Sequence, residues 1–239
     1  FRPLPFDFTR ASSATVVNKQ GLIETVQSGI SRIDFKNDAK GALLLEPQRS
    51  NLITYSEDFS NAYWTKSGSS VVSGFTSPDG TANAFKLVED TSTGGHSVQS
   101  AFLSLGGLEG TISLFAKKGE RHIIRITDNA TTGINVEADL NLGTITTTGQ
   151  SANITALTND WYRIDLTRAT TAGTSRWLIS ILDNGGNTSY TGDGTSGLYI
   201  YGAQVEQQSY PTSYIPTQGA ISTRLKDIAT NSGNASLIN

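Results

Sequence analysis

The chain has 239 residues and a formal net charge of -3, which is long enough for one large all-β domain with a smaller appendage. Charged residues make up only 16% of it, and no run of Lys or Arg forms the basic stripe expected of a nucleic-acid-binding protein. No stretch approaches the ~20 consecutive apolar residues that a membrane-spanning helix needs, so membrane insertion is not expected. Cys is absent, which excludes disulfides and thiolate metal sites.

The first 50 residues contain short β-like segments separated by small residues. In chain order these are FDFTRA, TVVN, LIETV, SRIDF and GALLLE. Each is too short to build a strong core by itself. Residues 1–50 are therefore predicted to be an N-terminal β-rich extension that packs on the main domain or on a neighbouring subunit.

From residue 51 onward the hydrophobic pattern has a period of two, which is typical of half-buried strands. In residues 111–118, Ile112, Leu114 and Ala116 alternate with Thr111, Ser113 and Phe115. In residues 122–128, Ile124 and Ile126 alternate with Ile123 and Arg125. Further strands follow in INVEADL, GTITTTG, WYRIDLTRA, SRWLISILD and GLYIYGAQVE.

Gly- and Asn-rich turn signals separate these strands at intervals of roughly 8 to 15 residues, the spacing of a sandwich and not of βαβ units. Residues 51–224 are therefore predicted to form an antiparallel β-sandwich with jelly-roll connections. The small polar residues 225–239 predict a linker toward a following domain.

Two segments carry a family resemblance: LLLEPQRSNLITYSEDFSNAYW at 43–64 and YGAQVEQQSYPTSYIPTQGAISTR at 201–224. Together with residues 8–24, 79–81 and 159–166, they resemble the concanavalin-like, carbohydrate-binding jelly-roll module of phage tail and head fibre (spike) proteins and of some bacterial surface proteins.

The resemblance implies a non-catalytic module that recognises a host cell-surface polysaccharide on a virion. It also implies contacts with other virion proteins, assembly into a homotrimer, and a location on the fibre or capsid, or otherwise on a cell surface. A purely structural module, acting as spacer, decoration or assembly interface, is the alternative. A carbohydrate-active enzyme is the third hypothesis.

Several motif residues have mechanical roles. Pro216 holds Ile215 extended, so Tyr214 and Ile215 are expected to be pinned across the end of the sandwich. Gly202 allows the backbone to approach a neighbour closely. Trp64 and Trp161 are predicted to pack in the core or at its rim, and Glu46 and Arg49 are expected to pair with buried polar groups.

The candidate ligand-binding residues lie on the less stereotyped strand and loop of residues 176–190. Trp177 shares a strand face with Ile179 and Ile181, which favours burial. The alternative is an exposed Trp177 near the end of a sheet, where it would offer a sugar ring a stacking platform. Tyr190 lies in a long Gly- and Ser-rich loop that is suited to binding. The predicted ligand-binding set is Trp177, Tyr190, Arg176, Asp183 and Asn184.

No catalytic residue is assigned. The two histidines, His96 and His122, are not part of a recognisable nucleophile motif. Paired carboxylates leave glycoside hydrolysis open, with candidates Glu46, Glu57, Asp58, Glu137, Asp165 and Glu206. No cofactor or metal site is assigned either. A structural calcium ion at the turns around Asp58, Asp79 and Asp183 remains an alternative without a supporting ligand spacing.

Overall fold

The computed structural model describes residues 6–129, 134–148, 151–169 and 173–230 of the chain. Every element that it assigns in these ranges is a β-strand, and all strand pairs are antiparallel. None of the described residues forms a helix long and apolar enough to cross a membrane. The predicted antiparallel β-sandwich is confirmed.

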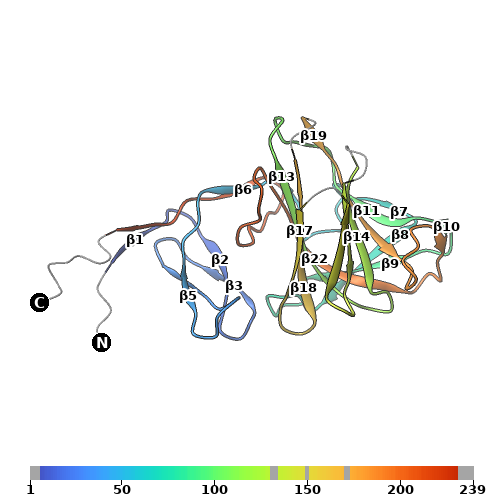
Figure 1. The fold of residues 1–239 in the computed structure, drawn as a ribbon, viewed down its shortest axis with the longest axis horizontal. Helices are drawn as coiled ribbons and strands as arrows, with labels where there is room; N and C mark the ends of the chain where they lie inside the picture. Colours follow the sequence, from blue (N-terminus) through green and yellow to red (C-terminus); the bar gives the residue numbers. More distant parts are fainter. Residues whose placement is uncertain (1–5, 130–133, 149–150, 170–172, 231–239) are drawn as a thin grey trace, which may run out of the picture.

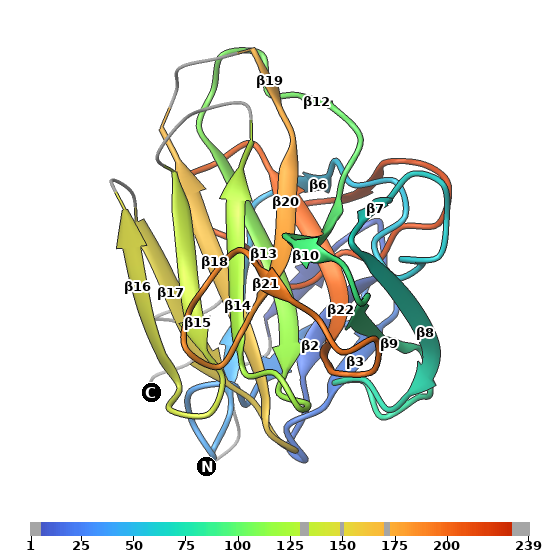
Figure 2. The ribbon, with the colours of Figure 1, turned by 90° about the vertical axis from the view of Figure 1, so that its right-hand side faces the viewer.

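Two six-stranded sheets form the sandwich (Figure 2). The first sheet has the order β16 (Thr144–Thr148), β15 (Asn135–Asp139), β14 (Ile123–Asp128), β20 (Trp177–Leu182), β11 (His96–Gln99), β7 (Thr65–Ser67). The second has the order β17 (Ser151–Ala156), β18 (Trp161–Arg168), β13 (Gly110–Lys117), β22 (Gly197–Glu206), β9 (Ala84–Glu89), β8 (Ser69–Phe75). Neighbours in each sheet are often distant in sequence, because the chain crosses repeatedly between the sheets.

The main core lies between the two sheets. In β14 the buried residues alternate with half-buried ones, so the prediction for residues 122–128 is confirmed. The prediction for residues 111–118 was wrong in one respect, because both faces of β13 are buried. The segment after β22 covers the outer face: the Thr111 hydroxyl donates to the carbonyl of Gln208 (2.6 Å), and the Phe115 ring lies 5.7 Å from that of Tyr214.

The predicted packing roles of the bracketing motifs are confirmed. Trp64 and Trp161 are buried, as are Tyr214 and Ile215. Gly202 has a φ of 61°, and a Cβ at this position would lie 2.9 Å from the Phe115 ring. A side chain there would be strained both by the backbone conformation and by the close contact.

Residues 6–51 form a small lobe beside the sandwich (Figure 1). It contains the hairpin of β2 (Ala14–Val17) and β3 (Ile23–Val26) and the hairpin of β4 (Arg32–Asp34) and β5 (Ala42–Leu44). Minor pairs elsewhere join β10 (Thr93–Gly94) to β21 (Tyr190–Thr191) and β12 (Leu103–Ser104) to β19 (Thr174–Ser175).

The end of the described chain returns to this lobe. Strand β23 (Ser222–Arg224) pairs with β6 (Arg49–Asn51), and β24 (Ile228–Thr230) pairs with β1 (Asp7–Thr9). The prediction of a linker from residue 225 was therefore wrong for residues 225–230, whose backbone groups are satisfied by strand pairing. Residues 231–239 lie outside the described residues.

A buried ion network holds these returning strands. Asp227 accepts a hydrogen bond from Arg10 (3.0 Å) and a shorter one from Arg32. The carboxylate of Glu46 forms ion pairs with Arg32 (2.8 Å) and Arg224 (2.7 Å). Glu46 thus has the buried partners that its motif predicted. Arg49, by contrast, donates to the carbonyl of Gln48 and to a Tyr hydroxyl near the surface.

Candidate functional site

The five predicted ligand-binding residues lie at opposite ends of β20 and do not form one site. Trp177 begins the strand and is fully buried with Ile179 and Ile181. The indole ring therefore has no exposed face on which a sugar could stack, and the prediction that Trp177 is a binding platform was wrong. The alternative, burial beside Ile179 and Ile181 on one strand face, is confirmed. Arg176 precedes it and stacks 5.0 Å above the exposed ring of Phe102.

At the far end of β20, Asp183 and Asn184 stabilise a turn. The Asp183 carboxylate accepts hydrogen bonds from the backbone N–H groups of Gly185 (2.9 Å) and Asn187 (2.8 Å) and from the Asn187 amide (2.8 Å). The Asn187 amide and the backbone donors lower the pKa of Asp183. Asn184 donates to the carbonyl of Glu120 (3.1 Å). Local turn geometry accounts for both side chains.

Tyr190 is held by a buried carboxylate. Its hydroxyl donates a hydrogen bond to Oε2 of Glu89 (2.7 Å). Arg121 donates to the same carboxylate twice, from Nε to Oε2 (2.8 Å) and from Nη2 to Oε1 (2.6 Å). The Arg121 guanidinium lies 5.3 Å from the Tyr190 ring centre, and burial raises the pKa of the phenol. His96 is fully buried beside the ring and bonds the carbonyl of Gly68. This cluster anchors the 183–196 loop.

Tyr190→Phe tests the anchoring role. The substitution removes one hydrogen bond to Glu89 but keeps the ring under Arg121, so the free energy of unfolding should fall by about 1 to 2 kcal/mol. Urea denaturation measures the change. Thr188→Ala, an exposed substitution in the same loop, is the control and should change stability by less than about 0.5 kcal/mol. Equal stability of Tyr190→Phe and wild type would contradict the anchoring role.

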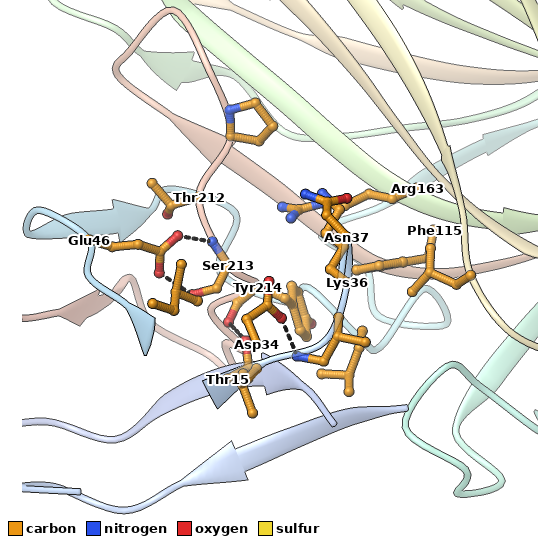
Figure 3. A pocket seen from close by; sticks show the side chains of 16 residues that line it. Thr15, Asp34, Lys36, Asn37, Glu46, Phe115, Arg163, Thr212, Ser213 and Tyr214 are labelled. Atoms are coloured by element: carbon orange, nitrogen blue, oxygen red, sulfur yellow. Dashed lines mark hydrogen bonds between the residues drawn. The ribbon is translucent and has the colours of Figure 1, made fainter. Parts of the chain in front are cut away.

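A cavity of about 210 Å³ lies between the N-terminal lobe and the outer face of the second sheet (Figure 3). Strands β2, β4 and β5 contribute one side, and β13, β18 and the segment before Tyr214 contribute the other. It is lined by Thr15, Val16, Val17, Ile23, Asp34, Lys36, Asn37, Leu44, Glu46, Phe115, Leu157, Arg163, Pro211, Thr212, Ser213 and Tyr214.

Several polar groups of the lining are already satisfied within the protein. The Thr15 hydroxyl donates to the carbonyl of Tyr214 (2.5 Å), and Asp34 accepts the backbone N–H of Val17 (3.0 Å). Glu46 receives the hydroxyl (2.6 Å) and the backbone N–H (2.7 Å) of Ser213. Burial disfavours ionisation of Glu46, but Arg224 and Ser213 outweigh burial and lower its pKa. The Glu46 carboxylate is therefore satisfied within the protein, whereas Asp34 accepts one hydrogen bond and keeps capacity for a ligand.

Arg163 has such capacity. Its position on β18 places it opposite Phe115 of β13, and its guanidinium lies 5.4 Å from that ring centre. The side chain is 8% exposed, and its Nη2 donates to the hydroxyl of Ser113 (2.8 Å). Its Nε has no hydrogen-bond partner among the described residues. Burial lowers the pKa of Arg163.

Lys36 and Asn37 lie at the mouth of the cavity, where both are exposed. Neither has a hydrogen-bond partner or an ion-pair partner among the described side chains. Partial enclosure by the surrounding protein lowers the pKa of Lys36, and repulsion from Arg163 adds to the effect. The cavity therefore presents two cationic groups and one amide to an incoming molecule, beside the carboxylates of Asp34 and Glu46.

The carboxylates considered for glycoside hydrolysis all have partners within the protein. Their partners are Arg32 and Arg224 for Glu46, Tyr201 and Tyr214 for Glu57, Ser60 for Asp58, Arg125 for Glu137, Asn153 for Asp165, and Thr212 for Glu206. Burial raises the pKa of Glu57, which borders a separate open groove with Asp58. Across the described ranges, no three His, Cys, Asp or Glu side chains are placed to hold a metal ion.

No family model and no curated protein sequence matches the chain. Among solved structures, the CBM22-1-GH10 modules of the Clostridium thermocellum endo-1,4-beta-D-xylanase 10B with xylohexaose align at 13% identity and a TM-score of 0.38, over 72% of this chain and 30% of that one. The mannan-recognising carbohydrate-binding module TmCBM27 aligns at 11% identity and a TM-score of 0.34, over 69% of this chain and 98% of that one. The chain thus spans less than a third of the xylanase chain. At these values neither similarity assigns a function to it.

Proposed function

We propose that the chain is a non-catalytic glycan-recognition module that binds sugar in the cavity between the N-terminal lobe and the second sheet. The observation that carries the proposal is the combination of apolar walls with the guanidinium of Arg163, which has no carboxylate partner, and the exposed side chains of Lys36 and Asn37. A sugar ring presents apolar C–H faces and a belt of hydroxyls, so it needs both kinds of surface. Concave, largely apolar sites with a few polar groups are the usual form of small-ligand sites.

The size of the cavity limits what it takes. Its volume of about 210 Å³ lies below the ~300–1,000 Å³ of typical drug-sized pockets. A single sugar residue at the end of a glycan, or on a branch, is the expected occupant, with the rest of the glycan outside the mouth near Lys36 and Asn37. One shallow contact of this kind binds weakly, so repetition in an oligomer would be needed for stable attachment, with gains of order 10² to 10⁴.

The biological setting that we propose is a phage fibre or spike, where a homotrimer of the chain attaches the virion to host polysaccharide beside other virion proteins. An extracellular or cell-surface protein is the alternative setting. The resemblance of residues 43–64 and 201–224 to the fibre module supports this part of the proposal. These segments account for the scaffold, whereas the cavity accounts for binding.

Asn37→Trp tests the site. A bulky side chain at the mouth should reduce glycan binding by at least tenfold, because it narrows the entrance without touching the core. Lys19→Trp, on the exposed turn between β2 and β3, is the matched control and should bind like wild type. The measurement is a screen on bacterial and algal polysaccharides followed by titration of each hit. Binding that survives Asn37→Trp unchanged would move the site elsewhere.

A purely structural module is the second candidate function, and one observation favours it. The lobe exposes a group of large apolar side chains on and around the β4–β5 hairpin: Ile30, Ile33, Leu43 and Leu45. Ile33 and Leu43 are directly paired, so they share one face. Exposed apolar groups of this kind are typical of assembly interfaces. Absence of binding to every polysaccharide tested would favour this alternative.

A further inference from the structure

We infer that the cavity selects an acidic sugar, whose carboxylate is bound by Arg163 with Lys36 as the second cation. The inference rests on the proposed function and adds the class of ligand. A hexuronate residue has the required chemistry, since it combines a sugar ring with one carboxylate.

Arg163 differs from the other buried arginines in its contacts with carboxylates. The five that the described residues contain are Arg10, Arg32, Arg163, Arg168 and Arg224. Four of them contact a carboxylate at 3.0 Å or less. Within the same ranges Arg163 has no carboxylate within 4.0 Å, and its Nη2 donates only to the neutral hydroxyl of Ser113. A buried charge without a partner is costly, and a bound carboxylate would supply one.

The guanidinium group of Arg163 is also placed to bind a carboxylate in the cavity. The guanidinium group presents its N–H donors as a planar fork that matches both oxygens of a carboxylate. Nη2 already donates to Ser113 and Nε is closed off from solvent, so the donor that Arg163 leaves for the cavity it lines is Nη1. The Phe115 ring supports the guanidinium from one side, which keeps it in position. Figure 3 shows the side chains of Lys36 and Asn37, from the lobe, close to that of Arg163, from β18.

The charged groups around Lys36 and Arg163 favour an anion of low charge. Partial enclosure is the largest cause of the lowered pKa of Lys36, and repulsion between Lys36 and Arg163 adds to it. An anion bound between them would relieve this repulsion. The carboxylates of Glu206, Asp165 and Glu46 act on Arg163 from beyond contact distance, and those of Asp34, Asp165 and Glu46 act on Lys36, so the positive field is reduced. This balance favours a singly charged carboxylate over a doubly charged phosphate monoester.

The test uses sodium D-galacturonate and sodium D-glucuronate, with galactose and glucose as neutral counterparts and inorganic phosphate as the competing anion. Amide chemical shifts of the ¹⁵N-labelled chain report binding. We expect both uronates to shift the resonances of residues that line the cavity, and the neutral sugars and phosphate to bind at least tenfold more weakly.

Two variants and a control sharpen the test. Arg163→Gln should weaken uronate binding by at least tenfold. Lys36→Glu reverses a charge at the exposed mouth and should also abolish uronate binding. Arg125→Gln, in an ion pair with Glu137 on the other sheet, should leave it unchanged. If Arg163→Gln does not fold, Lys36→Glu decides alone.

The outcomes separate this inference from the proposed function. Neutral sugars that bind in the cavity as tightly as uronates would overturn the inference and leave the glycan-binding module standing. Phosphate that binds as tightly as the uronates would also overturn it. Unchanged uronate binding by Lys36→Glu would do the same. If no sugar, free or polymeric, binds the wild-type chain, both proposals fail.

Discussion

Trp177→Ala is expected to lower the free energy of unfolding by about 3 to 5 kcal/mol, the range for replacing a large aromatic core residue with alanine. Trp177 is fully buried and belongs to the main core between the sheets, together with Ile179 and Ile181. Alanine would leave a cavity that the neighbouring side chains fill only in part, because the hydrogen bonds between strands hold the backbone of each sheet in place. Urea denaturation of wild type and variant measures the difference.

The control is Leu178→Ala, one residue further along β20 on the opposite face, where the side chain is only half-buried. It should cost clearly less than Trp177→Ala. Trp177→Phe should recover part of the loss, since it refills most of the cavity. A stable Trp177→Ala variant that had lost glycan binding would show instead that the indole contacts the ligand.

The same residue shows what local pattern can predict. The period-two pattern placed Trp177, Ile179 and Ile181 on one face, and that face is buried. The idea of an exposed platform came from its position near a strand end. It failed because Trp177 lies inward, while Phe102, on the edge segment beside Arg176, is exposed in its place. The alternation of residues along a strand indicates which side chains share a face. It does not indicate whether the neighbouring sheet or segment covers that face as far as the end of the strand.

The cavity could not be predicted from the sequence for a related reason. Lys36 and Arg163 are separated by most of the chain, and only the packing of the N-terminal lobe against the second sheet brings them together. Arg163 lies on the outer face of β18, opposite Ile164 and Leu166, and the pattern favours exposure there. The returning segment around Tyr214 covers that face instead. No local signal reports such long-range burial.

The linker prediction for residues 225–239 had a similar origin. Polar composition there indicates a linker, yet Asp227 is a buried ion-pair centre whose partners, Arg10 and Arg32, lie near the other end of the chain. A charged residue is compatible with burial when its partners are supplied by tertiary structure. The family-like segments, by contrast, gave correct packing roles because their constraints, such as Pro216 after Ile215, are local.

Asp227→Asn should therefore destabilise the fold by about 3 kcal/mol, since it leaves Arg10 and Arg32 buried with an incomplete set of acceptors. Burial disfavours the ionised form of Asp227, but the backbone N–H of Glu46, together with Arg10 and Arg32, outweighs burial and lowers its pKa. A carboxylate with a lowered folded-state pKa contributes stability above its ordinary pKa of 3.8, and the contribution is lost as pH falls through the folded value. Wild type should therefore lose stability below about pH 4, and the variant should lose less over the same range.

Asp160→Asn is the matched control for this last prediction. Asp160 is exposed and has a φ of 62°, a conformation that Asn tolerates well, so stability should change by less than about 0.5 kcal/mol at any pH. Chemical denaturation of the three proteins at pH 7 and pH 3 gives the comparison. Equal acid sensitivity of wild type and Asp227→Asn would mean that other carboxylates dominate the pH dependence. Equal stability at pH 7 would mean that the strand pairing of β24 with β1, and not the ion network, holds the end of the chain against the lobe.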